Sequence, residues 1–189
     1  MSLASTVYST ITNSDNWGAM YLKKASLDAT VSSVTFVSHL NVDNAGDGDL
    51  PPTNHWSMFL EIGASTSVHV DAVPNDPGEP AMIVVETKSS DVTQDASHTV
   101  VATAAAGTTI ANILSLILTL KRDKYVFAPV GEGCRFWLYT LAQDLAGAEI
   151  ISQDDANMAR NDLQYYWPSP VGTPARYRAF NKGTFLDSA

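Results

Sequence analysis

The chain has 189 residues, of which 45% are hydrophobic and 16% charged, so the sequence predicts one folded domain and no disordered chain. Twenty acidic and 11 basic residues give a formal net charge of -9. This charge argues against broad DNA or RNA binding and against membrane-surface binding, because both need a basic face. The single cysteine, Cys134, excludes a disulfide framework and a cysteine-based zinc site.

The charge is unevenly distributed along the chain. Residues 1–120 carry 12 acidic and three basic side chains, whereas residues 121–189 carry eight of each and all five arginines. Arginine is the usual residue for recognition of phosphate and carboxylate groups. An anionic partner would therefore contact the C-terminal third, although solvated arginines on terminal helices would give the same pattern.

The sequence shows no N-terminal secretory signal and no membrane span. The N-terminus lacks a basic region followed by an apolar segment, and no apolar stretch is long enough to span a bilayer. The sequence therefore predicts a cytoplasmic protein with no membrane partner, and we expect a monomer.

The first half of the chain has the pattern of antiparallel β-structure. Segments rich in β-branched residues or alternating in polarity predict strands, and the polar stretches 43–52 and 75–80 predict loops between them. Gly63, Ala64 and Ser65 predict the turn of a hairpin. The predicted strands cover residues 31–42, 55–62, 66–73, 81–87 and 98–103.

The second half of the chain changes to a helical pattern after Gly107. Apolar residues at helical spacing predict helices over 108–121 and 131–148, with a short strand at 125–130 between them. Ser152 and the acidic residues after it resemble a capping box that opens a third helix to about residue 166, before Pro168 and Pro170.

Strands followed by helices predict an α+β fold. We expect a single domain with an antiparallel sheet in the first half and about three helices packed on one face. Its predicted parts are an N-terminal extension (1–28), a mainly β part (29–106), a mainly α part (107–167) and a tail packed on the body (168–189).

Residues 131–140 (GEGCRFWLYT) bring a carboxylate, a thiol, a guanidinium and three aromatic rings close to a predicted helix start. On a helical wheel these residues separate onto two faces. The face toward the core holds Cys134, Leu138, Leu141 and Leu145, with Trp137 at its edge, and the opposite face holds Glu132, Arg135, Phe136 and Tyr139.

A first functional interpretation depends on Glu132 and Arg135. The pattern Glu-x-x-Arg-Phe resembles the Glu-Ala-Ala-Arg-Phe helix of plant and bacterial ribosome-inactivating toxins, which are rRNA N-glycosylases. The resemblance implies removal of one adenine from the sarcin–ricin loop of large-subunit rRNA on the ribosome. Arg135 would then stabilise the departing adenine, and Glu132 would stabilise the cationic sugar and orient the attacking water.

That family also stacks the adenine between two tyrosines, so aromatic side chains are expected near the pair. The candidates for this stacking role are Tyr139, Tyr125, Tyr165, Tyr166, Trp137 and Trp56. An ordinary ion pair between Glu132 and Arg135 on a solvated helix face would explain the same residues without any function.

A second resemblance covers roughly residues 30–186. The segments that carry it are 54–60 (NHWSMFL), 131–140 (GEGCRFWLYT) and 182–185 (KGTF). On these segments the chain is similar to an uncharacterised family of fungal proteins, and in size it is similar to the edodin-type mushroom ribosome-inactivating toxins. This resemblance also implies an rRNA N-glycosylase that inhibits protein synthesis.

The alternative interpretation depends on Cys134 and His55. The N-terminus of a helix favours the thiolate form of a cysteine, and a histidine on an earlier strand can act as its base. This order resembles circularly permuted papain-like hydrolases, including relatives of lecithin–retinol acyltransferase, although Gly133 stands where those relatives carry asparagine. The wheel instead points Cys134 toward the core, where a free cysteine is usually inert.

The sequence predicts no cofactor and no metal site. His69 and Asp71 share one face of a strand, but no third ligand follows at a suitable spacing, and Ala45 interrupts the EF-hand pattern of the acidic loop 43–49. The rRNA N-glycosylase is therefore our first prediction, and a cysteine hydrolase or acyltransferase is the alternative. A non-catalytic fungal defence or binding protein is the third possibility.

Overall fold

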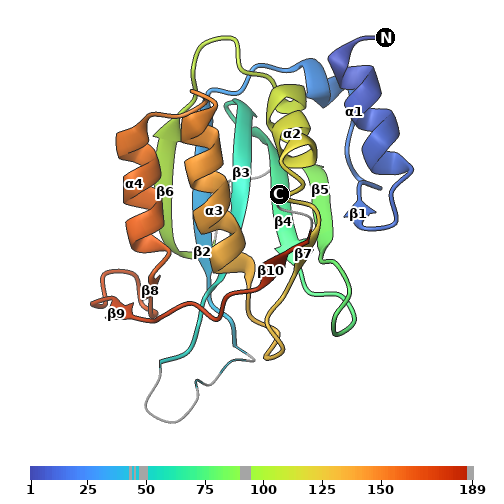
Figure 1. The fold of residues 1–189 in the computed structure, drawn as a ribbon. Coiled ribbons are helices and arrows are strands. Elements are labelled where there is room, and N and C mark those ends of the chain that lie inside the picture. Colours follow the sequence, from blue (N-terminus) through green and yellow to red (C-terminus); the bar gives the residue numbers. More distant parts are fainter. Residues whose placement is uncertain (43, 45, 47–50, 90–94, 187–189) are drawn as a thin grey trace.

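The computed structural model describes residues 1–42, 44, 46, 51–89 and 95–186, and a six-stranded sheet forms its centre (Figure 1). The strand order is β1-β5-β4-β3-β2-β6, and all neighbours are antiparallel except β1 and β5. Most of the predicted acidic loop lies outside the described residues. The strand bounds are β1 Trp17–Gly18, β2 Ser33–His39, β3 His55–Gly63, β4 Thr66–Val73, β5 Met82–Lys88 and β6 Ala96–Thr103.

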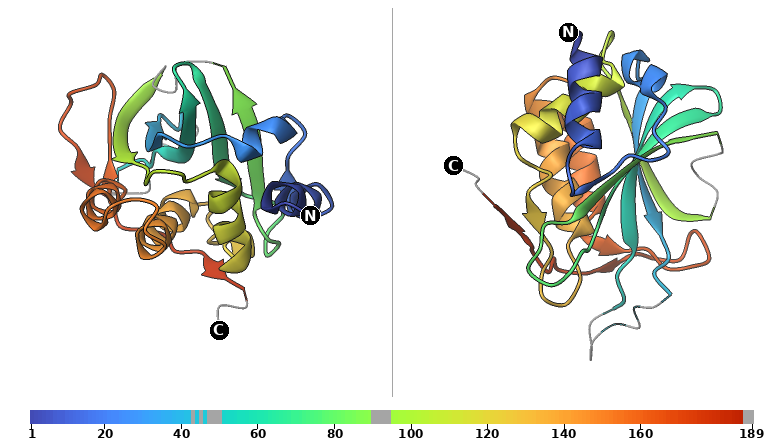
Figure 2. Two further views of the ribbon diagram at one scale, coloured as in Figure 1. Left: turned by 90° about the horizontal axis from the view of Figure 1, so that it is seen from above. Right: turned by 90° about the vertical axis from the view of Figure 1, so that its right-hand side faces the viewer.

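Among the described residues, four α-helices lie in a row on one face of the sheet (Figure 2). The helices are α1 (Leu3–Thr12), α2 (Ile110–Thr119), α3 (Cys134–Gly147) and α4 (Gln153–Asp162), with a short 3-10 helix, η1 (Lys24–Asp28). The predicted α+β fold, with its sheet in the first half of the chain, is confirmed. The five predicted strands form within three residues of the expected bounds.

Helix α1 lies in the segment that the sequence left as an extension. Its serines, threonines and valine have low helix propensity, so the sequence did not indicate a helix here. The Ser2 side chain caps the helix by accepting a hydrogen bond from the backbone of Ser5. Ala4, Val7 and Ile11 then form a buried stripe at helical spacing, so tertiary packing stabilises this helix.

The second-half elements are shorter than predicted. Helix α3 begins only at Cys134, and α4 ends at Asp162. Residues predicted as the end of that helix instead form β8 (Tyr165–Tyr166), which pairs with β9 (Arg176–Tyr177). The predicted strand at 125–130 is reduced to β7 (Tyr125–Val126), which pairs with β10 (Thr184–Phe185) of the tail.

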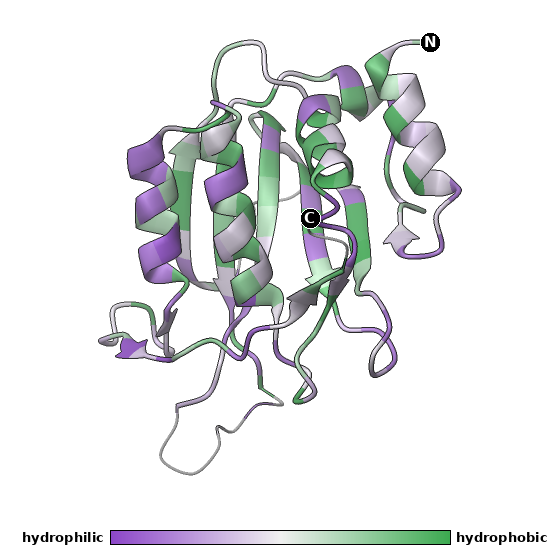
Figure 3. Ribbon diagram, in the orientation of Figure 1, coloured by the Kyte–Doolittle hydropathy of each residue, from purple (hydrophilic) through white to green (hydrophobic). Residues whose placement is uncertain are grey.

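The hydrophobic core lies between the sheet and the helices. Helix α2 is mostly hydrophobic and α4 mostly hydrophilic (Figure 3), which fits a deeply packed helix and an edge helix. Thr109 and Asn112 close a reciprocal capping box at the start of α2. In the described part of the chain, no helix combines the length and apolarity needed to cross a membrane.

Arg135 joins α3 to the C-terminal tail. Its side chain is buried, with 4% exposure, and donates hydrogen bonds to the backbone carbonyls of Leu163, Arg178 and Ala179 at 2.7–3.1 Å. The wheel placed Arg135 on a solvated face, and that placement is wrong because the tail covers this side of α3. The guanidinium supplies the donors that these carbonyls need away from water.

Replacing this arginine by an apolar side chain should destabilise the fold. In Arg135→Met three carbonyls lose a charged donor, so we expect the free energy of unfolding to fall by about 3 kcal/mol. Urea denaturation measures the change. Arg176→Met is the matched control, because Arg176 is exposed on β9, and its effect should stay within about 0.5 kcal/mol. Equal losses in both variants would contradict the role given to Arg135.

Candidate functional site

Three elements meet at one end of the sheet. The C-terminal end of β4 and the N-terminal end of α3 both lie at the lower end of the sheet in Figure 1, and β3 starts there with His55. The hairpin register pairs Met58 with Val70. His55 and Asp71 are therefore diagonal neighbours on one face of the sheet, close enough for their side chains to interact.

Asp71 and Cys134 both lie close to His55. The distance between His55 Nε2 and Asp71 Oδ2 is 2.8 Å, and Asp71 is buried, with 8% exposure. Cys134, a free and buried cysteine, lines the same pocket as His55 and lies close enough to raise the pKa of its imidazole. Thiol, imidazole and carboxylate thus lie in one cluster.

The surroundings of His55 favour its charged form. Burial lowers the pKa of His55, but the hydrogen bonds and negative charges of Asp71 and Cys134 outweigh burial and raise it to about 10. An imidazolium is therefore held at neutral pH. The thiolate is the form of a cysteine that acts as a nucleophile.

Cys134 lines a pocket of about 140 Å³ that is partly open to solvent. The N-terminal end of α3 lies at the wall of this pocket. Its cap residue is Gly133, which has no side chain to accept a hydrogen bond from the first turn of the helix. The first N–H groups of a helix lack partners within the helix and attract anions. The pocket is lined by Asn41, Thr53, Asn54, His55, Pro74, Phe127, Gly131, Glu132, Gly133, Cys134, Arg135, Phe136, Phe180 and Asn181.

A second, more apolar pocket adjoins the first. The two share Pro74, Phe127 and Gly131 as a common wall. The second pocket lies between residues 74–79 and the segment 126–131 that leads to α3. A substrate whose reacting carbon sits at Cys134 therefore has space for an apolar group beside it.

Glu132 and Arg135 both line the pocket, but both have protein partners. Glu132 accepts hydrogen bonds from Arg178 Nη2 at 2.9 Å and Asn181 Nδ2 at 2.8 Å. Arg135 donates to backbone carbonyls. Glu132 precedes the helix, so the two residues do not form the ordinary helical ion pair that the sequence suggested. Instead each residue binds the tail by a separate contact.

None of the six stacking candidates lines this pocket, and Tyr139, Tyr165 and Tyr166 are half-buried elsewhere on the protein. Tyr125, Trp137 and Trp56 are buried, with 0–1% exposure. The phenol oxygen of Tyr139 accepts a hydrogen bond from Arg160, and the guanidinium of Arg160 covers its ring. The aromatic residues that line the pocket are Phe127, Phe136 and Phe180.

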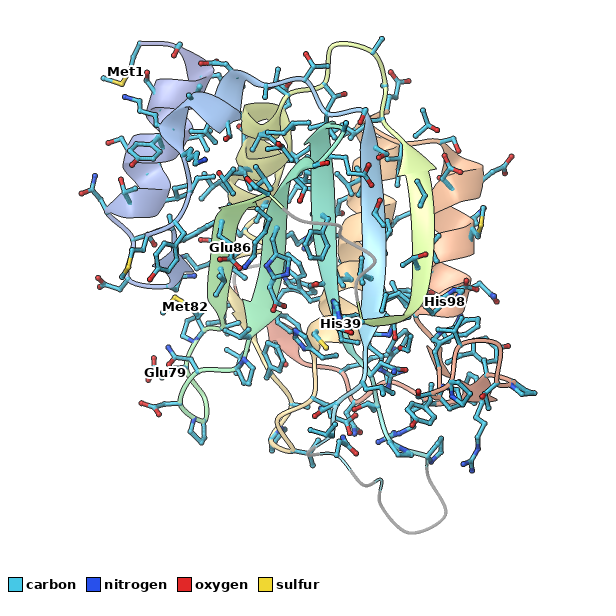
Figure 4. The ribbon with its side chains drawn as sticks, turned by 180° about the vertical axis from the view of Figure 1, so that it is seen from behind. Met1, His39, Glu79, Met82, Glu86 and His98 are labelled. Atoms are coloured by element: carbon cyan, nitrogen blue, oxygen red, sulfur yellow. The ribbon has the colours of Figure 1, made fainter. Side chains whose placement is uncertain are left out.

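Two further histidines lie on the same face of the sheet as His55. His39 is directly opposite His55 in the register of β2 and β3, and Figure 4 shows His39 near the end of the sheet. Burial and the positive charges of His55 and His69 lower the pKa of His39. His69 pairs with Glu86 at 3.1 Å. Among the described residues, no group of three or more His, Cys, Asp or Glu side chains is arranged to hold a metal ion.

Comparison with known proteins gives a family for the chain. Residues 34–186 match the family described as Domain of unknown function (DUF7770). The chain belongs to the DUF7770 family. No curated protein and no solved structure shows a significant match. His55, Asp71 and Cys134 all lie within the DUF7770 match, so the candidate site belongs to the domain that defines the family.

The sequence identified two of the three residues that meet in this DUF7770 domain. It gave Cys134 and His55 as alternative catalytic residues and assigned Asp71 only to a rejected metal pair. The turn at Gly63–Ser65 carried the missing signal, because it places Asp71 two residues before the residue opposite His55 in the hairpin. Cys134 is buried, as the wheel predicted, but it lines the pocket beside His55.

The charge of Asp71 should control the titration of His55. In Asp71→Asn a neutral amide replaces the carboxylate while burial remains, so the pKa of His55 should fall from about 10 toward or below its ordinary value. An NMR pH titration of the His55 ring measures this shift. Glu86→Gln, which makes the same change beside His69, is the control and should leave His55 charged to high pH. A wild-type His55 that titrates near pH 6.5 would contradict the ion pair.

Proposed function

We propose that the protein is a cysteine hydrolase or acyltransferase. Cys134 is the nucleophile, His55 is the general acid and base, and Asp71 holds the imidazole in place. The hydrogen bond between His55 and Asp71, with Cys134 beside His55 in the same pocket, carries this proposal. A nucleophile within reach of a base, itself oriented by a third group, is the arrangement that covalent catalysis requires.

In the first half of the reaction the Cys134 thiolate attacks a carbonyl carbon of the substrate. A carbon–sulfur bond forms, and the electron pair of the carbonyl π bond moves onto oxygen. When this pair returns, the bond to the leaving group breaks, and His55 donates its proton to the leaving alcohol, thiol or amine. The products are an acyl-thioester on Cys134 and a neutral His55 hydrogen-bonded to Asp71.

In the second half a water molecule restores the enzyme. Neutral His55 takes a proton from water while the oxygen attacks the thioester carbon. Collapse of this intermediate breaks the carbon–sulfur bond, releases a carboxylic acid and regenerates the thiolate beside the imidazolium. An alcohol or amine in place of water gives acyl transfer by the same steps. The apolar pocket beside Cys134 supports an acyl donor with an apolar group.

The rRNA N-glycosylase stays a prediction with less support. Its two residues line the pocket, but Glu132 is bound by Arg178 and Asn181, and Arg135 is bound by three carbonyls. A departing adenine would need a free donor, and an aromatic pair would need to face the pocket. The three phenylalanines of the pocket are the surfaces left for that stacking.

The hydrolase proposal is tested with activated esters, thioesters and anilides of short and longer acyl chains. Cys134→Ala should lower kcat/KM about 10³-fold or more for any substrate that wild-type protein cleaves, because the nucleophile is lost. Mass spectrometry should detect an acyl group on Cys134 of the wild type. His69→Gln is a control on the same sheet face and should retain activity. Hydrolysis that survives Cys134→Ala would overturn the proposal.

One assay separates the two enzymatic predictions. Ribosomes are incubated with pure protein, and aniline then cleaves rRNA wherever a base has been removed. The hydrolase proposal expects no discrete fragment from the wild type. A fragment that persists in Cys134→Ala and disappears in Glu132→Gln would establish the N-glycosylase instead.

A further inference from the structure

One buried hydroxyl connects the segment before the nucleophile with the tail. Tyr125 is fully buried. Its hydroxyl donates a hydrogen bond to the carbonyl of Gly133 at 3.0 Å and accepts one from the N–H of Gly183 at 2.9 Å. A single oxygen thus joins β7, the residue before α3 and the tail residue before β10. A phenol with two buried partners is held in one orientation.

Both partners must be glycine for the hydroxyl to fit between them. A Cβ atom on Gly133 would lie 2.9 Å from the Phe127 ring and 3.0 Å from the Tyr125 oxygen. A Cβ on Gly183 would overlap the Tyr125 ring and the carbonyl oxygen of Val126. Side chains at either position would therefore push the hydroxyl away.

The bond from Tyr125 fixes the direction of a catalytically placed N–H. The Gly133 carbonyl also accepts a hydrogen bond from Trp137 N–H at 3.0 Å, so two donors hold it. In a planar trans peptide the carbonyl of Gly133 and the N–H of Cys134 point in opposite directions. Two donors on the oxygen therefore set where the N–H points. Cys134 is the first residue of α3, and the helix supplies no acceptor for that N–H.

We infer that Tyr125 is a positioning residue that aims the Cys134 N–H at the oxyanion formed during acylation. The inference rests on the proposed function, because it concerns the same attack on a carbonyl. As the carbon–sulfur bond forms, the π electron pair moves onto oxygen, and the Cys134 N–H donates a hydrogen bond to the resulting negative charge. A donor held in place before the reaction stabilises this charge without reorganisation.

The test compares two reactions of the same thiolate. Acylation by an activated ester forms an oxyanion, whereas alkylation by iodoacetamide displaces iodide and forms none. Tyr125→Phe removes one oxygen atom and keeps the ring, so Gly133 retains only the bond from Trp137. We expect the acylation rate and kcat to fall about 10- to 100-fold, with KM and the alkylation rate changed less than about twofold.

Asp123→Asn is the matched control. It weakens a buried hydrogen bond, in which Trp17 Nε1 donates to Asp123 Oδ2 at 3.2 Å, two residues before Tyr125 and without contact to Gly133. This variant should acylate and alkylate at wild-type rates. Urea denaturation of both variants separates lost stability from lost positioning.

Two results would overturn the inference and leave the hydrolase proposal intact: unchanged acylation in Tyr125→Phe, or an equal fall in acylation and alkylation. The second result would mean that Tyr125 merely holds Cys134 in place. A wild-type protein that alkylates at Cys134 but is never acylated would overturn the proposed function, and this inference with it.

Discussion

The antiparallel register of β3 and β4 is the constraint on which the candidate site depends. Pairing of Met58 with Val70 places His55 and Asp71 on one face, while Trp56 and Ala72 face the helices. A slip of one residue would turn the imidazole and the carboxylate into the helix-covered core and expose the apolar side chains. Burying that carboxylate without its partner costs several kcal/mol. The same strand register therefore buries the core and brings His55 and Asp71 together.

Most of the arginines bind other groups of this protein. The C-terminal third carries every arginine, which suggested an anion-binding surface. In the described residues four of the five are occupied: Arg122 pairs with Asp144, Arg135 with carbonyls, Arg160 with Gln143 and Tyr139, and Arg178 with Glu132 and Pro51. Guanidinium groups have several donors in a fixed geometry, which suits them to crowded backbone carbonyls. Two of these four, Arg135 and Arg178, attach the tail to the body of the protein.

Local patterns in the sequence predicted five strands of the sheet and three of the four α-helices of the described residues, but most of the site required information that only packing supplies. The strands around His55 and the start of α4 at Ser152 followed from alternation and capping. The helical wheel failed at Arg135 because it assumed a helix from residue 131 and a solvated outer face. Three residues precede the true start, and the tail covers that face. The hairpin turn held the signal for Asp71, whereas the role of Tyr125 depends on a contact with the distant Gly183, which no spacing rule contains.

The segment from Glu132 to Arg135, on which both functional interpretations depend, is held in place by its contacts with the tail. Glu132 and Arg135 flank Cys134, and each binds the tail: Glu132 through Arg178 and Asn181, and Arg135 through the carbonyls of Arg178 and Ala179. These contacts bring Phe180 and Asn181 into the wall of the pocket. A pocket built partly from a tail needs strong, directional bonds on both sides of Cys134, because the tail has little regular structure of its own. Glu132 and Arg135 therefore hold the tail in the wall of the pocket, and Cys134 lies between them in the sequence.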